Sequence, residues 1–417
     1  MSDIGNEAVT KDVRQGTVGN NQVELSANQP RQTFGQMLRN DLSFLPVLLT
    51  LIVIWSYFGI ATQGLFLYPR NLSNLVLQVA TTGVYALAVT PVLLIGEIDL
   101  SLASVGTLGA VIMGVLVQRA GWSAGPGIAV ALLAGALVGM VNGVLVAVIR
   151  IPAFIVTLAA SIAYEGLLLY LQFGQSTLII TNDTIISIAG SPRSYLPWYL
   201  GIGLPIVVVV LYIIGILYGQ LQRYRAGLKV KPLWQLILQL ALVVALVGGA
   251  VLLFENYLGV PNTTVILVGL ILVFWLVLTK TGFGRHIYAV GGNSEASRRA
   301  GINVTAIRIV VFTLCSTLAV VGSIMEASRQ TAVASLIDPT LLLSAIAAAV
   351  IGGISLFGGR GSVWSIILGV LIIGSLINGL ALMGQTQAVE EMIEGAVLAI
   401  AVAADAIIRR AQARTGR

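Results

Sequence analysis

Long apolar segments alternate with short polar connections along most of this 417-residue chain. The apolar segments are about 20 residues long, the length of a helix that crosses a bilayer core of about 30 Å. About twelve membrane-spanning helices are predicted, at residues 44–62, 72–95, 100–117, 128–149, 152–171, 195–218, 233–254, 260–279, 306–325, 341–353, 363–383 and 388–408. The segments lack the strict alternation of a membrane barrel. The predicted fold class is therefore an all-α polytopic membrane protein.

Composition supports this class. Hydrophobic residues make up 57% of the chain and charged residues only 10%, whereas soluble domains carry about 25% charged residues. In a membrane protein, a net charge of +6 indicates basic loops rather than nucleic-acid binding. Residues 1–43 are polar and lack apolar periodicity, so we expect a disordered cytoplasmic tail before a membrane domain at 44–408. Residues 409–417 are expected to form a basic cytoplasmic tail.

Basic residues predict the orientation. Four basic clusters lie in the first 43 residues, at 223–231, at 280–299 and at the C-terminus. Even numbers of predicted spans separate them, so they share one side, which the positive-inside rule assigns to the cytoplasm together with both termini. Some arginines fall on the opposite side and weaken the asymmetry without reversing it: Arg70, Arg119, Arg193 and Arg329. The outer connections 173–194 and 326–340 are then candidate docking surfaces for a partner protein, or mere connections.

Residues 282–304, GFGRHIYAVGGNSEASRRAGINV, are the longest polar interruption in the second half of the chain. Asn293 or Ser294 can cap a short helix. Glu295 and two arginines complement the helix dipole, and Gly301 suits a left-handed helix end. This capped helix is predicted to face a partner in the cytoplasm. The alternative is a basic loop that only obeys topology.

Glycines mark two further features. Gly135, Gly139 and Gly143 form a doubled GxxxG in the fourth predicted span, which favours close helix packing over a role in ligand binding. The glycine cluster at 352–361 is too dense for a regular helix, and broken helices in membranes line protein or water-filled cavities. We therefore place the cluster at the translocation pathway.

Few residues offer chemistry inside the spans. Asp99, followed by Ser101, is predicted either to cap the third span or to take part in the transport path. Glu165 is an isolated carboxyl within a span, and it can hydrogen-bond a hydroxyl of a transported solute, pair with a basic residue or remain protonated. A solvated outer rim is expected for the acidic residues that begin the last span: Glu390, Glu391 and Glu394. The candidate pathway residues are Asp99, Ser101, Asn142, Glu165, Gly352, Gly353 and Ser355.

Enzymatic chemistry is not expected. The chain has no GxxxxGK[ST] phosphate loop, so it is not expected to bind ATP by that route. His286 is the only histidine and Cys315 the only cysteine. A single residue of each kind supports neither a metal site nor a catalytic triad. No cofactor and no metal are therefore expected.

Four blocks, in order from the second span towards the C-terminus, resemble the bacterial ABC-type permeases for ribose, xylose, arabinose and galactose. They are IGEIDLSLAS at 95–104, RIPAFIVTLAA at 150–160, FGRHIYAVGGNSEASRRAGINV at 283–304 and AIAAAVIGGISLFGGRGSV at 345–363. The insertion at 196–260 resembles the longer, xylose-type branch. Two positions depart from the family pattern. Glu97 stands where glycine is usual, and Leu343-Ser344 stand where an acidic residue usually precedes AIAA, with Asp338 as a nearby substitute.

The resemblance implies the permease subunit of an ABC importer for a monosaccharide, a pentose such as xylose. It implies a homodimer in the bacterial inner membrane among membrane lipids, a separate ATPase that binds ATP, and a periplasmic or lipid-anchored sugar-binding protein. The capped helix becomes the coupling helix that contacts the ATPase, with the residues Asn293, Ser294, Glu295, Ala296, Arg298, Arg299 and Gly301. The alternatives are a proton-coupled secondary transporter that uses Asp99 or Glu165, and a scaffold or channel without energy coupling.

Overall fold

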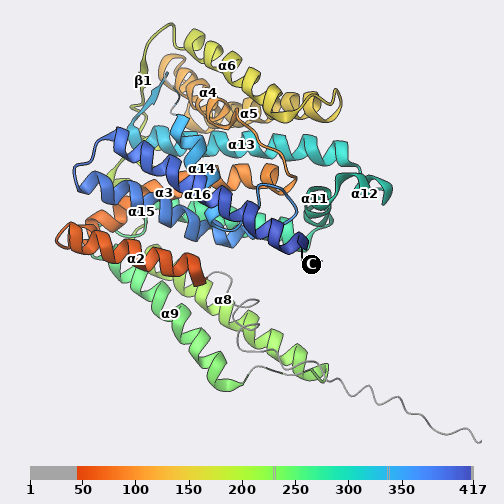
Figure 1. Cartoon of the computed structure of the whole chain (residues 1–417). Coiled ribbons are helices and arrows are strands. Elements are labelled where there is room, and N and C mark those ends of the chain that lie inside the picture. Colours follow the sequence, from red (N-terminus) through yellow and green to blue (C-terminus); the bar gives the residue numbers. More distant parts are fainter. Residues whose placement is uncertain (1–44, 229, 231, 336, 338, 415–417) are drawn as a thin grey trace, which may run out of the picture. The chain divides into compact units, whose positions relative to one another are not determined.

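The structure is a computed structural model, and it describes residues 45–414 except 229, 231, 336 and 338 (Figure 1). The expected N-terminal tail, 1–43, lies outside the described residues. So does Asp338, the proposed substitute for the missing acidic residue. At the other end, the last helix continues through 409–414, so the expected C-terminal tail is helical over the part that the structure describes.

Each of the twelve predicted spans is helical. They correspond to α2 (Leu45–Ala61), α3 (Pro69–Leu94), α4 (Leu102–Gly114) with its π-helical end η2 (Val115–Arg119), α5 (Ala124–Ala147), α6 (Ala153–Leu171), α8 (Trp198–Arg225), α9 (Leu233–Glu255), α10 (Asn262–Lys280), α13 (Val304–Gln330), α14 (Pro339–Ile351), α15 (Ile366–Leu382) and α16 (Gln387–Arg414). Between them lie η1 (Leu65–Leu67), β1 (Thr177–Ile179), α7 (Asp183–Ile186), η3 (Pro192–Ser194), α11 (Gly282–Gly292), α12 (Ser294–Arg299), β2 (Ala332–Ala334) and η4 (Val363–Ser365).

The predicted number of spans is confirmed only in part. Among the described residues, nine helices are both long and apolar enough to cross a membrane. The helices α2 and α14 are apolar but have only 17 and 13 residues. Helix α16 is long, but Glu390, Glu391, Glu394 and Asp405 interrupt its apolar sequence. The structure therefore supports an all-helical membrane fold with nine clear spans.

Helix α13 lies at the centre of the packing and contacts α3, α4 and α5 (Figure 1). The doubled GxxxG of α5 faces it. A Cβ added at Gly139 would stand 2.6 Å from the carbonyl oxygen of Phe312, and one at Gly143 would stand 2.8 Å from the Cα of Ile309. Only glycine permits helix backbones to approach this closely. The predicted packing role of these glycines is confirmed.

The glycine cluster interrupts a helix as predicted. Helix α14 ends at Ile351, and the chain resumes regular structure only at η4. Gly353, Gly358 and Gly359 adopt positive φ angles of 93°, 84° and 75°, which most other residues avoid. The short α14 and this turn together replace one continuous span.

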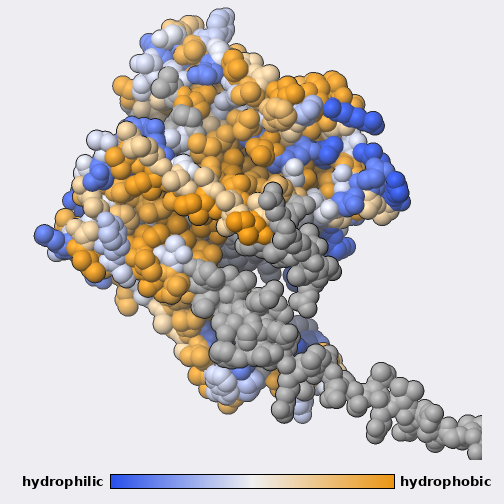
Figure 2. Space-filling model, viewed as in Figure 1, coloured by the Kyte–Doolittle hydropathy of each residue, from blue (hydrophilic) through white to orange (hydrophobic). Residues whose placement is uncertain are grey.

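Opposite ends of the bundle carry different structures. At one end, β1 and β2 pair antiparallel, with Leu178 opposite Val333. At the other end, the turn that follows α3 meets α11 and the glycine turn after α14. Figure 2 shows hydrophilic residues gathered where α11 and α12 lie, and broad hydrophobic areas elsewhere on this face. Only 6% and 0% of the most apolar windows of α8 and α9 are buried, as expected for helices that face lipid.

Candidate functional site

A polar stripe runs along α3. Its members recur every three or four residues, so they share one face of the helix: Asn71, Asn74, Gln78, Thr81, Thr82 and Tyr85. Polar side chains inside a membrane helix are costly and normally face the bundle interior or a water-filled cavity. The stripe begins at the end of the bundle that carries the β1–β2 pair and reaches the middle of α3.

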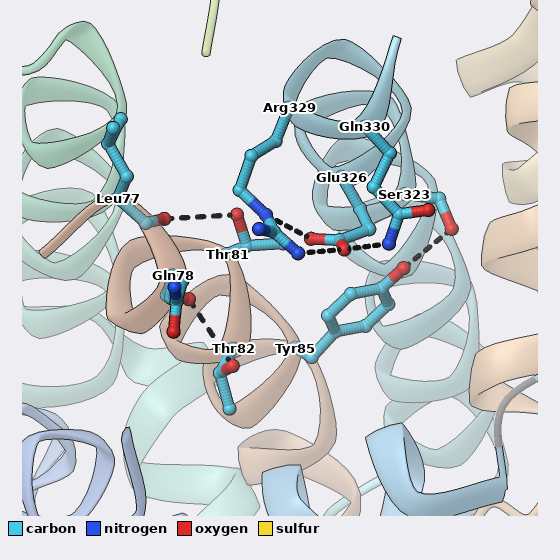
Figure 3. A network of polar contacts seen from close by, with 9 residues as sticks. All are labelled: Leu77, Gln78, Thr81, Thr82, Tyr85, Ser323, Glu326, Arg329 and Gln330. Atoms are coloured by element: carbon cyan, nitrogen blue, oxygen red, sulfur yellow. Dashed lines mark hydrogen bonds and ion pairs between the residues drawn. The ribbon is translucent and has the colours of Figure 1, made fainter. Parts of the chain in front are cut away.

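Helix α13 places an ion pair against this stripe (Figure 3). The guanidinium of Arg329 contacts both carboxylate oxygens of Glu326, at 2.6 Å and 3.2 Å. The Gln330 amide also donates to Glu326. One helical turn before Glu326, Ser323 exchanges a hydrogen bond with the Tyr85 hydroxyl. The side chains of Glu326 and Arg329 are 21% and 32% exposed, so this fork-shaped pair is partly accessible.

Two cavities adjoin the stripe and share Gln78 and Arg329 in their walls. One cavity, of about 370 Å³, is lined by polar residues apart from Leu341 and Ile377: Gln78, Thr81, Thr82, Glu326, Arg329, Thr340, Ser344, Gln387, Glu390, Glu391 and Glu394. The other cavity, of about 430 Å³, includes Asn71, Asn74, Tyr195 and Tyr257. Amides, hydroxyls, four carboxylates and a guanidinium supply both donors and acceptors. We call these two cavities the polar groove.

Sequence reasoning missed the polar groove. Residues 326–340 were expected to form an outer connection, but α13 continues to Gln330, which keeps Glu326 and Arg329 in the helix. The acidic residues at the start of α16 were expected to form a solvated rim. Glu391 is exposed, as expected, but all three residues also line the groove, and Glu394 accepts a hydrogen bond of 3.1 Å from Ser344. The signal in the sequence that could have indicated the groove is the three- to four-residue spacing of the polar residues on α3.

Three of the predicted pathway residues meet in one buried network. The Asp99 carboxylate accepts hydrogen bonds from the Ser101 backbone N–H at 2.9 Å and from its hydroxyl at 2.6 Å. Asn142 of α5 donates to Ser101 at 3.1 Å, and Tyr164 of α6 donates to Asn142 at 2.9 Å. Asp99, Ser101 and Asn142 are all 0% exposed. The network joins the turn before α4 to α5 and α6.

The predicted cap by Asp99 is wrong in detail, because Ser101 occupies the N-cap position of α4. Asp99 instead accepts from the backbone N–H of Ser101 itself, which fixes the turn between α3 and α4. Its second oxygen, Oδ2, has no hydrogen-bond partner among the described residues, and Cys315 of α13 is a neighbouring group. The network does not line the polar groove.

The other predicted pathway residues lie elsewhere. Ser355 donates to Asp405 of α16 at 3.2 Å, and this carboxylate also accepts the Leu356 N–H. Gly352 and Gly353 end α14, next to the same turn. Glu165 is half-buried on α6, and no ion pair involves it within the described part of the chain. These residues do not join the Asp99 network.

The short helix α12 has the predicted local structure. The Asn293 side chain accepts from the Ala296 N–H at 2.9 Å and caps the helix. Glu295 pairs with Arg298 at 3.6 Å and with Arg299 at 3.2 Å, and Gly301 is left-handed with φ 85°. These exposed ion pairs contribute little stability. The cap and the glycine therefore define the two ends of the helix.

The backbone of α11, which precedes α12, contacts the end of α3 and the turn after α14. Gly291 lies against Leu94 at the end of α3 and against Gly359 in the turn after α14. The Gly359 N–H donates to the Leu94 carbonyl at 2.8 Å, and the Tyr288 hydroxyl donates to the Gly361 carbonyl at 3.0 Å. We call this contact of three segments the glycine junction. Through α11, it links the segment that carries α12 to α3, which carries the polar stripe.

A family model described as the permease component of the branched-chain amino acid transport system matches residues 71–402. This match covers the polar stripe, the Asp99 network and the glycine junction. The chain belongs to the permease family of ABC-type sugar importers. It is a non-catalytic transport subunit of the bacterial membrane, and the family implies an ATPase and a binding protein as partners.

Several relatives cover nearly the whole permease. The xylose transport system permease protein of Escherichia coli is 35% identical over 89% of this chain and 93% of its own length. The fructose import permease protein of Rhizobium meliloti is 31% identical over 92% and 91%. The ribose import permease protein of Escherichia coli is 30% identical over 82% and 87%. No solved structure matches the chain.

Proposed function

We propose that this permease imports a pentose such as xylose and that the sugar passes along the polar groove. The observation that carries this proposal is the polar stripe of α3 opposite Glu326 and Arg329. A sugar presents hydroxyls in many directions, and the groove offers donors and acceptors at matching density. Tyr195 and Tyr257 at one end supply aromatic surface for the apolar faces of a sugar ring.

The groove fits transient passage rather than tight binding. Glu326 and Arg329 hydrogen-bond to each other. When a sugar hydroxyl that has bound to one of them moves on, neither side chain is left without a partner. We infer that selectivity between sugars resides mainly in the binding protein. The xylose assignment is supported by the similarity to the xylose permease of Escherichia coli.

We further propose that α12 is the coupling helix, that both termini are cytoplasmic and that two copies form the pathway. The contacting residues of α12 are those of the capped turn: Asn293, Ser294, Glu295, Ala296, Arg298, Arg299 and Gly301. Closure of the ATPases would press on α12, and the glycine junction would carry that displacement into α3 and the turn after α14. The positions of Asp99 and Ser355 in these turns make them structural supports of the pathway.

The test is reconstitution of the permease in vesicles with the ATPase and the binding protein encoded beside it. ATP-dependent accumulation of labelled D-xylose, competed by other pentoses, is expected. Calorimetry on the neighbouring binding protein then identifies the sugar independently. Accumulation of an unrelated solute with no response to pentoses would overturn the sugar assignment. Accumulation without ATP would overturn the energy source.

A further inference from the structure

A separate basic cavity lies beside α12. Its volume is about 320 Å³, and its walls come from α5, the turn before α6, α12, the start of α13 and the turn after α3. Three arginines line it, namely Arg150, Arg298 and Arg308, with Glu97 as the only acidic residue in the wall. The wall therefore carries two more positive than negative formal charges. This cavity shares no residue with the polar groove.

Glu97 neutralises the arginines incompletely. Arg308 Nε lies 2.8 Å from Glu97 Oε1, yet this N–H is not aligned for a hydrogen bond, and Glu97 Oε2 has no partner among the described residues. Burial raises the pKa of the Glu97 carboxyl, and attraction by Arg308 offsets only part of this rise. Glu295 touches Arg298 at 3.6 Å but is 59% exposed, so solvent screens that contact.

Backbone strain supports a role for Arg150. Its φ is 65°, a left-handed conformation that is uncommon outside glycine, asparagine and aspartate. A glycine would fit this turn with less strain, but the sequence has an arginine there, at the edge of the cavity. The first turns of α6 and α13 also line the cavity, through Ala153 and through Thr305, and helix N-termini favour negative charge.

We propose that this cavity binds a phosphomonoester group. Guanidinium groups bind phosphate oxygens in pairs, and three of them lining one partly open cavity suit a dianion better than a single carboxylate. The cavity has room for a small organic group beside the phosphate. A phosphorylated sugar and the headgroup of phosphatidic acid offer the same chemistry.

Such a ligand bridges three separate segments of the molecule. Arg298 belongs to α12, Arg150 to the turn between α5 and α6, and Arg308 to α13. A phosphate held by all three would fix α12 against the bundle. If α12 is the coupling helix, as the proposed function requires, the bound ligand would lower ATP-driven uptake. Kinases that phosphorylate an imported sugar are the class of reaction that would supply it.

The binding test uses the full-length permease in nanodiscs of phosphatidylcholine, without the ATPase. Thermal unfolding is measured with D-ribose 5-phosphate, inorganic phosphate and D-ribose at constant ionic strength. The phosphomonoester is expected to raise the melting temperature saturably, and D-ribose is not. Arg150→Gly relieves backbone strain, so it tests the site without endangering the fold. The double variant Arg150→Gly with Arg298→Gln is expected to bind the phosphomonoester about tenfold more weakly than the wild type. Arg285→Gln, an exposed change outside the cavity, is the matched control.

Each outcome decides the matter. If nanodiscs that contain phosphatidic acid are stabilised but D-ribose 5-phosphate has no effect, the phosphomonoester comes from lipid. If neither stabilises the wild type, or Arg285→Gln weakens binding as much as Arg150→Gly, the site is absent. ATPase binding to the cavity variants is measured separately. If Arg150→Gly and Arg298→Gln weaken ATPase binding and no phosphomonoester binds the wild type, the cavity receives an acidic side chain of the ATPase, and the proposal is wrong.

The functional arm adds D-ribose 5-phosphate to the α12 side of vesicles that contain ATPase and binding protein. Uptake is expected to fall about fivefold or more, a coupling of ordinary size, and Arg150→Gly is expected to remove the inhibition. Binding without inhibition would keep the site but remove its regulatory role. Loss of uptake under all conditions would count against the proposed function, not against the phosphomonoester site, because binding is measured separately.

Discussion

Gly291 packs against Leu94 so closely that a Cβ added at Gly291 would stand 1.8 Å from the Leu94 carbonyl oxygen. The same Cβ would stand 2.6 Å from the Gly359 nitrogen, which donates a hydrogen bond to that carbonyl. No side chain fits here, because both neighbours are backbone. The contact therefore packs α11, α3 and the turn after α14 together as one unit.

Gly291→Ala tests this unit. The substitution must separate α11 from Leu94, and overpacking of this kind costs about 1–3 kcal/mol. ATP-driven uptake is expected to be largely lost. Gly292→Ala is the matched control, since a Cβ there meets nothing within 4 Å. Uptake and unfolding temperature of both variants provide the comparison, and equal behaviour of the two variants would remove the junction from the mechanism.

Glu295→Arg combined with Gly301→Val tests α12 itself. The charge reversal opposes the helix dipole, which costs about 0.3–1 kcal/mol. Valine at φ 85° adds strain on the order of 1–3 kcal/mol. Membrane insertion is expected to stay normal, while ATP hydrolysis continues without sugar uptake. The control is Glu295→Gln with Gly301→Asn, since asparagine tolerates the left-handed conformation. Normal uptake by the valine-containing pair would remove the coupling role.

Much of the fold follows from the sequence because bilayer thickness fixes the length of apolar segments. Each predicted span is a helix. The helix-capping residues were equally informative at α12, where Asn293 and Gly301 mark the two ends of the helix. These features depend on residues a few positions apart, so they can be read without knowledge of tertiary contacts.

The polar groove depends on contacts between distant segments, and for that reason the sequence did not reveal it. Glu326 and Arg329 look like part of a loop until α13 is known to continue past them. Asp99 looks like a cap until Ser101 is seen at that position. Glu394 looks solvated until Ser344 of α14 is found beside it. Which polar residues face one another is decided by packing, and packing is not encoded in local periodicity.

Thr82→Val tests the polar groove with almost no change in side-chain shape. It removes one hydroxyl from the groove wall, and the loss of one hydrogen bond in the passage is expected to lower the maximal uptake rate about three- to tenfold. Thr90→Val is the matched control on the same helix. Its hydroxyl bonds the Ala86 carbonyl at 2.6 Å and lies outside the groove. An equal loss in both variants would indicate a helix effect and exclude a groove effect.

Glu165 provides the test of energy coupling. Because an ATPase supplies the energy in this family, uptake by vesicles with internal ATP is expected to persist when a protonophore dissipates the proton gradient. Glu165→Gln keeps the side-chain size, so a lower uptake rate would place this half-buried residue in the sugar path. Uptake that stops with the protonophore in the wild type but not in Glu165→Gln would instead favour proton coupling.

Asp99 is expected to act through the turn that it fixes. Asp99→Ala leaves the buried Ser101 N–H and hydroxyl without their acceptor, at a cost of about 1–3 kcal/mol for each unsatisfied group. Asp99→Asn keeps an acceptor oxygen in place, so the thermal unfolding temperature should fall much less than in the alanine variant. Uptake then separates the two interpretations of this carboxyl. If Asp99→Asn is stable but does not transport sugar, the negative charge itself takes part in transport; if it transports normally, the hydrogen bonds to Ser101 are sufficient.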